Sequence, residues 1–155
     1  MYLRLPPKIK VLEAASTLAD SRIKVLNDKE AIVKSSDGSR EYYVFLDISK
    51  GEACSTDNGT VYRKYIGYPI IAFLMIKGIL PYNEKVGNAL KGIKWRELNE
   101  KFKKYSLVEE EIKKLVFSKG VSPVYLDMFK ERVYNILKSR VRLRLSSKCS
   151  EKLTK

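Results

Sequence analysis

Seven consecutive apolar residues, Ile70–Ile76, follow Pro69 and would leave a helix without a polar face. Proline suits the first turn of a helix, so we expect a helix to begin at Pro69. A helix that is apolar almost all round is normally buried on several sides. The run is far shorter than the ~20 residues that cross a bilayer. We therefore predict that it forms the central helix of a protein core.

The chain before this run changes from a helical spacing of apolar residues to an alternation with period two. Residues 7–20 have the helical spacing, and the alternation from Arg22 onward is typical of strands. Asp37-Gly38 is a strong hairpin signal, and residues 57–59 are expected to form a loop. The predicted strands are 22–27, 31–36, 40–48 and 52–55. The pattern predicts a helix, a small antiparallel β-meander and then the buried helix.

From Tyr82 onward the pattern is helical. Ser106 with Glu109 fits a capping box, and Ser122-Pro123 fits the start of a last long helix. We expect helices over 83–91, 95–105, 106–120 and from 123 to about 140. The predicted fold class is therefore α+β, with a C-terminal helical region after the buried helix. We divide the chain into residues 1–81 and 82–155, with the alternative that the two parts pack as one domain.

Several classes of chemistry are excluded by composition. The chain has no histidine and only two cysteines, Cys54 and Cys149. This removes His-based nucleophile pairs, imidazole bases and a zinc site with four ligands from one chain. No Gly-rich phosphate loop is present. We therefore predict a binding module rather than an enzyme, with no catalytic residue, no metal and no cofactor.

The expected compartment is the cytoplasm. The first ten residues contain no apolar run of the kind that a secretory signal needs. In a reducing cytoplasm both cysteines are expected to be free thiols. Glutamine is absent while Lys and Glu are abundant, which favours a thermophilic source.

Positive charge is concentrated in the second half of the chain. The net charge is +13, and residues 82–155 carry 19 basic and 9 acidic side chains against 12 and 9 in residues 1–81. Such an excess favours a polyanionic partner, which could be DNA, RNA or an acidic protein. The alternative is that a Lys-rich surface only keeps the protein soluble. We expect neither a small-molecule substrate nor a membrane as the partner.

The sharpest local feature is the alternation over residues 140–145, Arg-Val-Arg-Leu-Arg-Leu. As a strand it would place three guanidinium groups on one face, whereas a helix would spread them around its surface. Arginine binds phosphate through two parallel hydrogen bonds, so a row of arginines suits a nucleic-acid backbone. A solvated helix end, where cations are ordinary, is the alternative. The candidate nucleic-acid-binding residues are Arg140, Arg142, Arg144, Lys138, Lys148, Lys103 and Lys104, with Lys152 and Lys155 completing the terminal run.

Residues 10–80 resemble a SWIM domain in the order of their elements. Residues 36–44, Ser-Asp-Gly-Ser-Arg-Glu-Tyr-Tyr-Val, match the hairpin and aromatic strand that precede the zinc motif of that family. Cys54 falls at the first ligand position, and residues 70–74 match the start of the apolar helix. The resemblance implies DNA binding or protein–protein contact, including assistance to homologous recombination.

The other three ligands of a SWIM domain are missing. Thr56, Gly67 and Pro69 stand at the second cysteine, third cysteine and histidine positions. The resemblance is therefore to a degenerate, metal-free SWIM-like domain, in which packing replaces zinc. We expect a plug formed by Tyr62, Tyr65, Ile66 and Tyr68, and a shared core formed by Tyr43, Phe45 and the helix over 70–76.

Together these features favour nucleic-acid binding through the basic C-terminal half. The alternative is a protein–protein adapter, possibly one that contacts a recombination or repair ATPase.

Overall fold

The computed structural model describes residues 1–153 and has an α+β fold, which confirms the predicted class. The strands are β1 (Ile23–Val25), β2 (Glu30–Lys34), β3 (Glu41–Asp47), β4 (Glu52–Ser55) and β5 (Arg144–Leu145). The helices are α1 (Ile9–Ala19), α2 (Asn58–Arg63), α3 (Tyr68–Ile76), α4 (Glu84–Ala89), α5 (Trp95–Phe102), α6 (Tyr105–Ser118), α7 (Pro123–Arg140), the 3-10 turn η1 (Ser147–Cys149) and α8 (Ser150–Leu153).

The sheet has the strand order β1-β2-β3-β4-β5. The first four strands form an antiparallel meander, and β5 adds to β4 in the parallel direction. Gly38 has a φ of +74° in the turn between β2 and β3, a conformation that glycine adopts without strain, so the predicted hairpin is confirmed. The parallel addition of β5 brings the C-terminal arginines to the edge of the meander.

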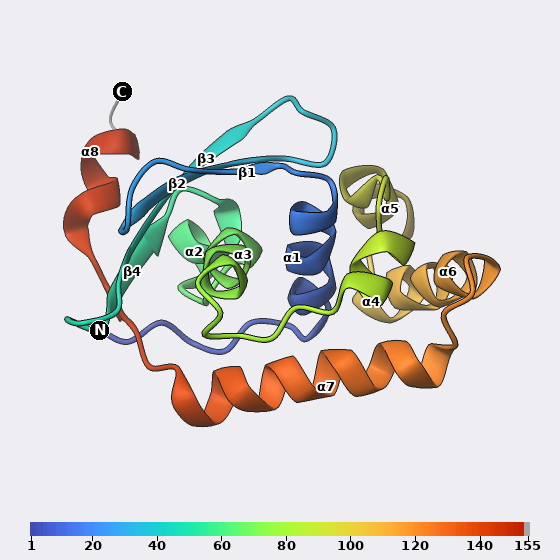
Figure 1. Cartoon of the computed structure of the whole chain (residues 1–155). Coiled ribbons are helices and arrows are strands. Elements are labelled where there is room, and N and C mark those ends of the chain that lie inside the picture. The colour runs from blue at the N-terminus through green and yellow to red at the C-terminus, as the bar shows by residue number, and fades with distance from the viewer. Residues whose placement is uncertain (154–155) are drawn as a thin grey trace.

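The helix α3 lies at the centre of the main core. Residues 70–74 are at most 1% exposed, so the predicted buried helix is confirmed, although Ile76 at its end is 46% exposed. The helices α1 and α3 pack together, and Figure 1 shows both of them between the sheet and α7. One hydrophobic cluster includes buried residues from Leu3 to Leu143. Both halves of the chain therefore contribute to the same core.

Two local predictions are wrong, and both concern the start of a helix. Residues 57–59 are not a loop, since the side chain of Asp57 accepts a hydrogen bond from the Thr60 N–H and begins α2. The capping box at Ser106 does not form, because α6 begins one residue earlier with Lys104 at its N-cap position. Ser122, by contrast, caps α7 as predicted.

The outer face of the sheet carries a second, smaller cluster. Tyr43 and Phe45 pack there with Cys54 and Cys149. The prediction that these two residues share the core around α3 is therefore wrong. The reason is that successive side chains of β3 point to opposite faces of the sheet. Val44 and Leu46 point into the main core, whereas Tyr43 and Phe45 point to the outer face.

The two cysteines are not free thiols, which corrects the prediction from composition. Cys54 on β4 and Cys149 at the end of η1 form a disulfide, with Cα atoms 5.9 Å apart. The return of the chain along β5 brings Cys149 onto the outer face of the sheet. Among residues 1–153, no helix combines the length and the apolarity that a bilayer-spanning segment requires.

Candidate nucleic-acid interface

The alternating segment after α7 is extended and not helical. Arg140 is the last residue of α7, and Val141 already has extended dihedral angles. Leu143 is 3% exposed, whereas Arg142 and Arg144 are exposed on the opposite side. The structure therefore aligns two of the three arginines on one face of an extended segment, while Arg140 is held at the helix end.

The N-terminal segment pairs with these arginines. The Leu3 N–H donates to the Leu143 carbonyl and the Leu145 N–H to the Met1 carbonyl, so residues 1–3 run antiparallel to the arginine segment. The guanidinium carbon of Arg142 lies 4.1 Å from the centre of the Tyr2 ring. Stacking of this kind holds the guanidinium in place and leaves its N–H donors available at the ring edge.

The same segment continues to a second group of cations. The Arg4 N–H donates to the Lys64 carbonyl, and the Arg4 guanidinium donates to the Arg63 carbonyl at 2.9 Å. Arg4 and Arg63 line a groove with Tyr65 and Tyr105. Figure 1 shows the N-terminal segment crossing the molecule from the end marked N, beside β4, to the start of α1. Two arginine clusters far apart in sequence are thus joined by one extended segment.

We call this surface the N-terminal strip and define it by six residues. They lie on or beside residues 1–4 and comprise three arginines and three tyrosines: Arg142, Arg4, Arg63, Tyr2, Tyr65 and Tyr105. None of its arginines has a carboxylate within ion-pair distance among residues 1–153. The strip therefore presents cations whose charge is not neutralised within the described protein.

The other predicted residues are divided between the two ends of the strip. Lys138 is exposed on the last turn of α7, and Lys148 lies over the Phe45 ring on the outer face of the sheet. Lys103 and Lys104 connect α5 to α6, immediately before Tyr105. In Figure 1, α5 and α6 lie on the far side of the molecule from α8. The seven predicted residues therefore do not form one patch, and Lys155 lies outside the described residues.

Sequence reasoning missed Tyr2, Arg4 and Arg63. The only local signal was the succession Tyr2-Leu3-Arg4, in which the outer two residues are exposed and Leu3 is buried. A strand-like alternation of three residues is too short to identify a strand from sequence.

A polar cavity of about 390 Å³ opens beside Tyr65. Its walls come from α1, the β2–β3 hairpin, the start of α2 and α5, and they include Lys10, Glu13, Arg40, Tyr42, Tyr68 and Trp95. The ammonium of Lys10 lies 3.0 Å from a carboxylate oxygen of Glu13, and both side chains are largely buried. This cavity was not anticipated from the sequence, because its residues are separated by as many as 90 positions and have no shared motif.

The electrostatics of the cavity are dominated by burial. Burial alone would lower the pKa of Lys10, but the Glu13 carboxylate, Tyr65 and Tyr105 together raise it above its usual value. Burial raises the pKa of Tyr65 to about 12. It also raises the pKa of Asp57, against hydrogen bonds from Thr60 that lower it. The walls therefore favour a charged Lys10 and neutral phenols.

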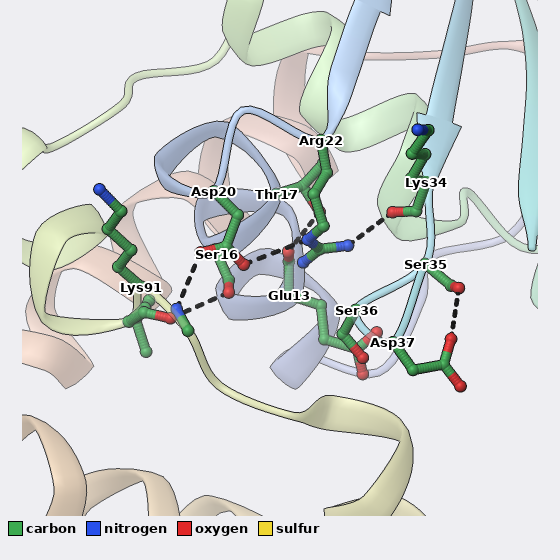
Figure 2. A network of polar contacts seen from close by, with 12 residues as sticks. Glu13, Ser16, Thr17, Asp20, Arg22, Lys34, Ser35, Ser36, Asp37 and Lys91 are labelled. Atoms are coloured by element: carbon green, nitrogen blue, oxygen red, sulfur yellow. Dashed lines mark hydrogen bonds and ion pairs between the residues drawn. The ribbon is translucent and has the colours of Figure 1, made fainter. Parts of the chain in front are cut away.

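A polar network fixes the walls of this cavity. Figure 2 shows Arg22 between Asp20, at 3.1 Å, and the main-chain carbonyl of Lys34 on β2, at 2.7 Å. Asp20 also accepts a hydrogen bond from the N–H of Gly92, which ties α1 to the chain that leads into α5.

The hairpin end is held in the same way. Arg96 at the start of α5 donates to Asp37 and Ser39. Hydrogen bonds from the Ser35 hydroxyl and from Ser39, together with Arg96, hold the pKa of Asp37 well below its usual value. The cavity is therefore built by tertiary contacts between four separate parts of the chain.

The segment that was expected to replace zinc by packing differs in part from the prediction. A side chain on Gly67 would collide with Asp57 and Thr60, whose hydroxyl accepts the Gly67 N–H. Tyr62 is 76% exposed and takes no part in a plug, whereas Ile66 is buried. No group of three or more Cys, Asp or Glu side chains in residues 1–153 is arranged to hold a metal ion.

A family model described as Uncharacterised conserved protein UCP014422 matches residues 3–143. The chain belongs to this family. The match includes Arg4, Arg63 and every wall of the cavity, and it ends at Leu143, before Arg144 and Cys149. Comparison with curated proteins and with solved structures gave no match.

Proposed function

We propose that this protein binds nucleic acid along the N-terminal strip. The observation that carries the proposal is the stacking of Arg142 on Tyr2 within a row of arginines that have no carboxylate partner in the described chain. Phosphates are neutralised by Lys and Arg, and this term supplies most of non-specific affinity. The exposed phenols add stacking surfaces for bases.

The aromatic rings beside the cations favour a single strand over a duplex. In a duplex the bases are stacked on one another, whereas the bases of a single strand can lie on aromatic side chains. Base–aromatic stacking contributes about 1–3 kcal/mol for each base. We therefore propose an unpaired strand of DNA or RNA as the ligand, with the degenerate SWIM-like resemblance as a further argument for DNA.

The test is a salt titration of strand binding. Each phosphate contact on a single strand should contribute a slope of about −0.7 to the dependence of log affinity on log salt. Replacing the three arginines of the strip, Arg4, Arg63 and Arg142, by alanine should reduce the steepness of the slope by roughly 2 units if all three contact phosphates. The matched control removes the same charge at three exposed positions away from the strip, by Lys24→Ala, Lys114→Ala and Arg132→Ala.

The control variant should keep the steep dependence of affinity on salt, because its substitutions lower the net charge without removing a phosphate contact. Equal slopes for the two triple variants would contradict a site at these arginines. Strand binding should exceed duplex binding at the same salt, measured by fluorescence anisotropy. If the wild-type protein binds neither form even at low salt, the proposal fails.

A protein adapter is the second candidate function, and an exposed apolar surface favours it. Phe117 at the end of α6 is 67% exposed, and Val124 and Met128 on the first turns of α7 are 69% and 66% exposed. Exposed apolar residues that gather at one place are typical of contact surfaces. The test is co-purification of one stoichiometric protein that survives nuclease treatment and is lost in Phe117→Asp. Retention of that protein by the Phe117→Asp variant would argue against this surface.

A further inference from the structure

The cavity beside the N-terminal strip has the volume and the lining residues of a small-ligand site. Its volume of about 390 Å³ lies within the range of small-ligand pockets, roughly 300–1,000 Å³. Tyr42, Tyr65, Tyr68 and Trp95 supply aromatic surface, and Tyr42 and Tyr68 meet edge to face with ring centres 6.3 Å apart. Tyr65 belongs both to this cavity and to the strip.

Its charges are balanced. Lys10 is paired with Glu13, and Arg96 is paired with Asp37 and Glu100. A phosphate in the cavity would have to compete with these carboxylates. A neutral, planar and polar group is a better match, because it can contact the aromatic walls without disturbing the ion pairs.

Two polar atoms of α5 have no hydrogen-bond partner among residues 1–153. They are Nε1 of Trp95, a donor, and Oδ1 of Asn99, an acceptor, and both residues line the cavity. A buried polar atom without a partner is unfavourable. Neither atom is open to solvent in this structure, so the Asn99 side chain must turn before a ligand can reach them. A ligand with an acceptor and a donor on one edge would then satisfy both atoms, and the hydrogen-bonding edge of a nucleobase has this chemistry.

We infer that this cavity receives one unpaired nucleobase of the strand that lies on the N-terminal strip. The inference rests on the proposed function, since the strip supplies the phosphate contacts. The base enters past Tyr65 and lies against the aromatic walls, with its polar edge toward α5. Arg40, which is exposed at the cavity and has no carboxylate partner among residues 1–153, contacts the phosphate next to the inserted base.

Trp95 makes the inference measurable, because it is the only tryptophan of the chain and it lines the cavity. A base inserted beside it should quench its fluorescence. The experiment compares a short mixed-sequence single strand with an abasic strand of the same length and charge. Binding of each strand is measured by anisotropy, and Trp95 emission is measured with the unlabelled strands.

The expected result is that both strands bind, but only the strand with bases quenches Trp95. Asn99→Ala should reduce the quenching several-fold while the salt slope stays unchanged. Arg132→Ala on α7 serves as a control, and it should leave the quenching and the salt slope unchanged. Binding of the normal strand without quenching, or equal quenching by the abasic strand, would overturn the inference and leave the proposed function intact. Failure of both strands to bind would overturn the two together, and anisotropy alone would report it.

Discussion

Cys54 and Cys149 form a disulfide across 95 residues of sequence, and it attaches the C-terminal segment to the outer face of the sheet. Reduction should lower the free energy of unfolding by about 2–5 kcal/mol, because the unfolded chain regains the freedom of a long closed loop. Thermal unfolding with and without reductant measures the effect. The Cys149→Ser variant should start at the lower stability and should not respond to reductant. If the Cys149→Ser variant is as stable as the oxidised protein, the disulfide contributes nothing to the free energy of unfolding.

Residue Ala72 on α3 is fully buried, whereas Ile76 on the same helix is 46% exposed. The Ala72→Asp variant should fail to fold, since a buried carboxylate without a partner is strongly unfavourable. The Ile76→Asp variant places the same group at the exposed end of the helix and should remain folded. Circular dichroism and thermal melts distinguish the two. Similar melting temperatures for the two variants would be incompatible with the central position of α3.

The glycine at position 67 leaves room for a neighbouring carboxylate. A Cβ atom there would lie 2.3 Å from Oδ2 of Asp57 and 2.6 Å from the Thr60 hydroxyl. Gly67→Ala should therefore destabilise the protein by roughly 1–3 kcal/mol, as overpacked sites do. Asn58→Ala, at an exposed neighbour of Asp57, should change stability little. Chemical denaturation measures both, and a neutral Gly67→Ala would mean that Asp57 moves aside freely.

Stability should fall at alkaline pH, in part through Tyr65 and Lys10 of the cavity. The pKa of Tyr65 rises from 10.0 to about 12 on folding, and the pKa of Lys10 is also raised. A raised pKa means that the folded state holds its proton more tightly, so this stability is complete below pH 10 and is lost as pH rises toward 12. Tyr65→Phe should flatten the decline in melting temperature over this interval. An unchanged decline would exclude Tyr65 as a contributor.

The sequence by itself determined those elements that depend on neighbouring residues. The apolar run after Pro69 predicted α3, Asp37-Gly38 predicted the hairpin, and Ser122-Pro123 predicted the start of α7. Each of these signals acts within one or two turns of chain, where backbone preference and hydrophobic period decide the outcome. The same local rules failed at Ser106, where the helix begins at Tyr105 and the capping box has no role.

Only the tertiary structure decided which distant residues meet. The disulfide, the stacking of Arg142 on Tyr2 and the walls of the cavity all depend on how the N- and C-terminal segments close against the sheet. Charge counting placed the excess in residues 82–155, but the fold brings Arg4 and Arg63 from the first half to the same strip. The physical reason is that these contacts form when the whole chain buries one common core. That burial depends on residues far apart in the sequence, so no local sequence pattern predicts it.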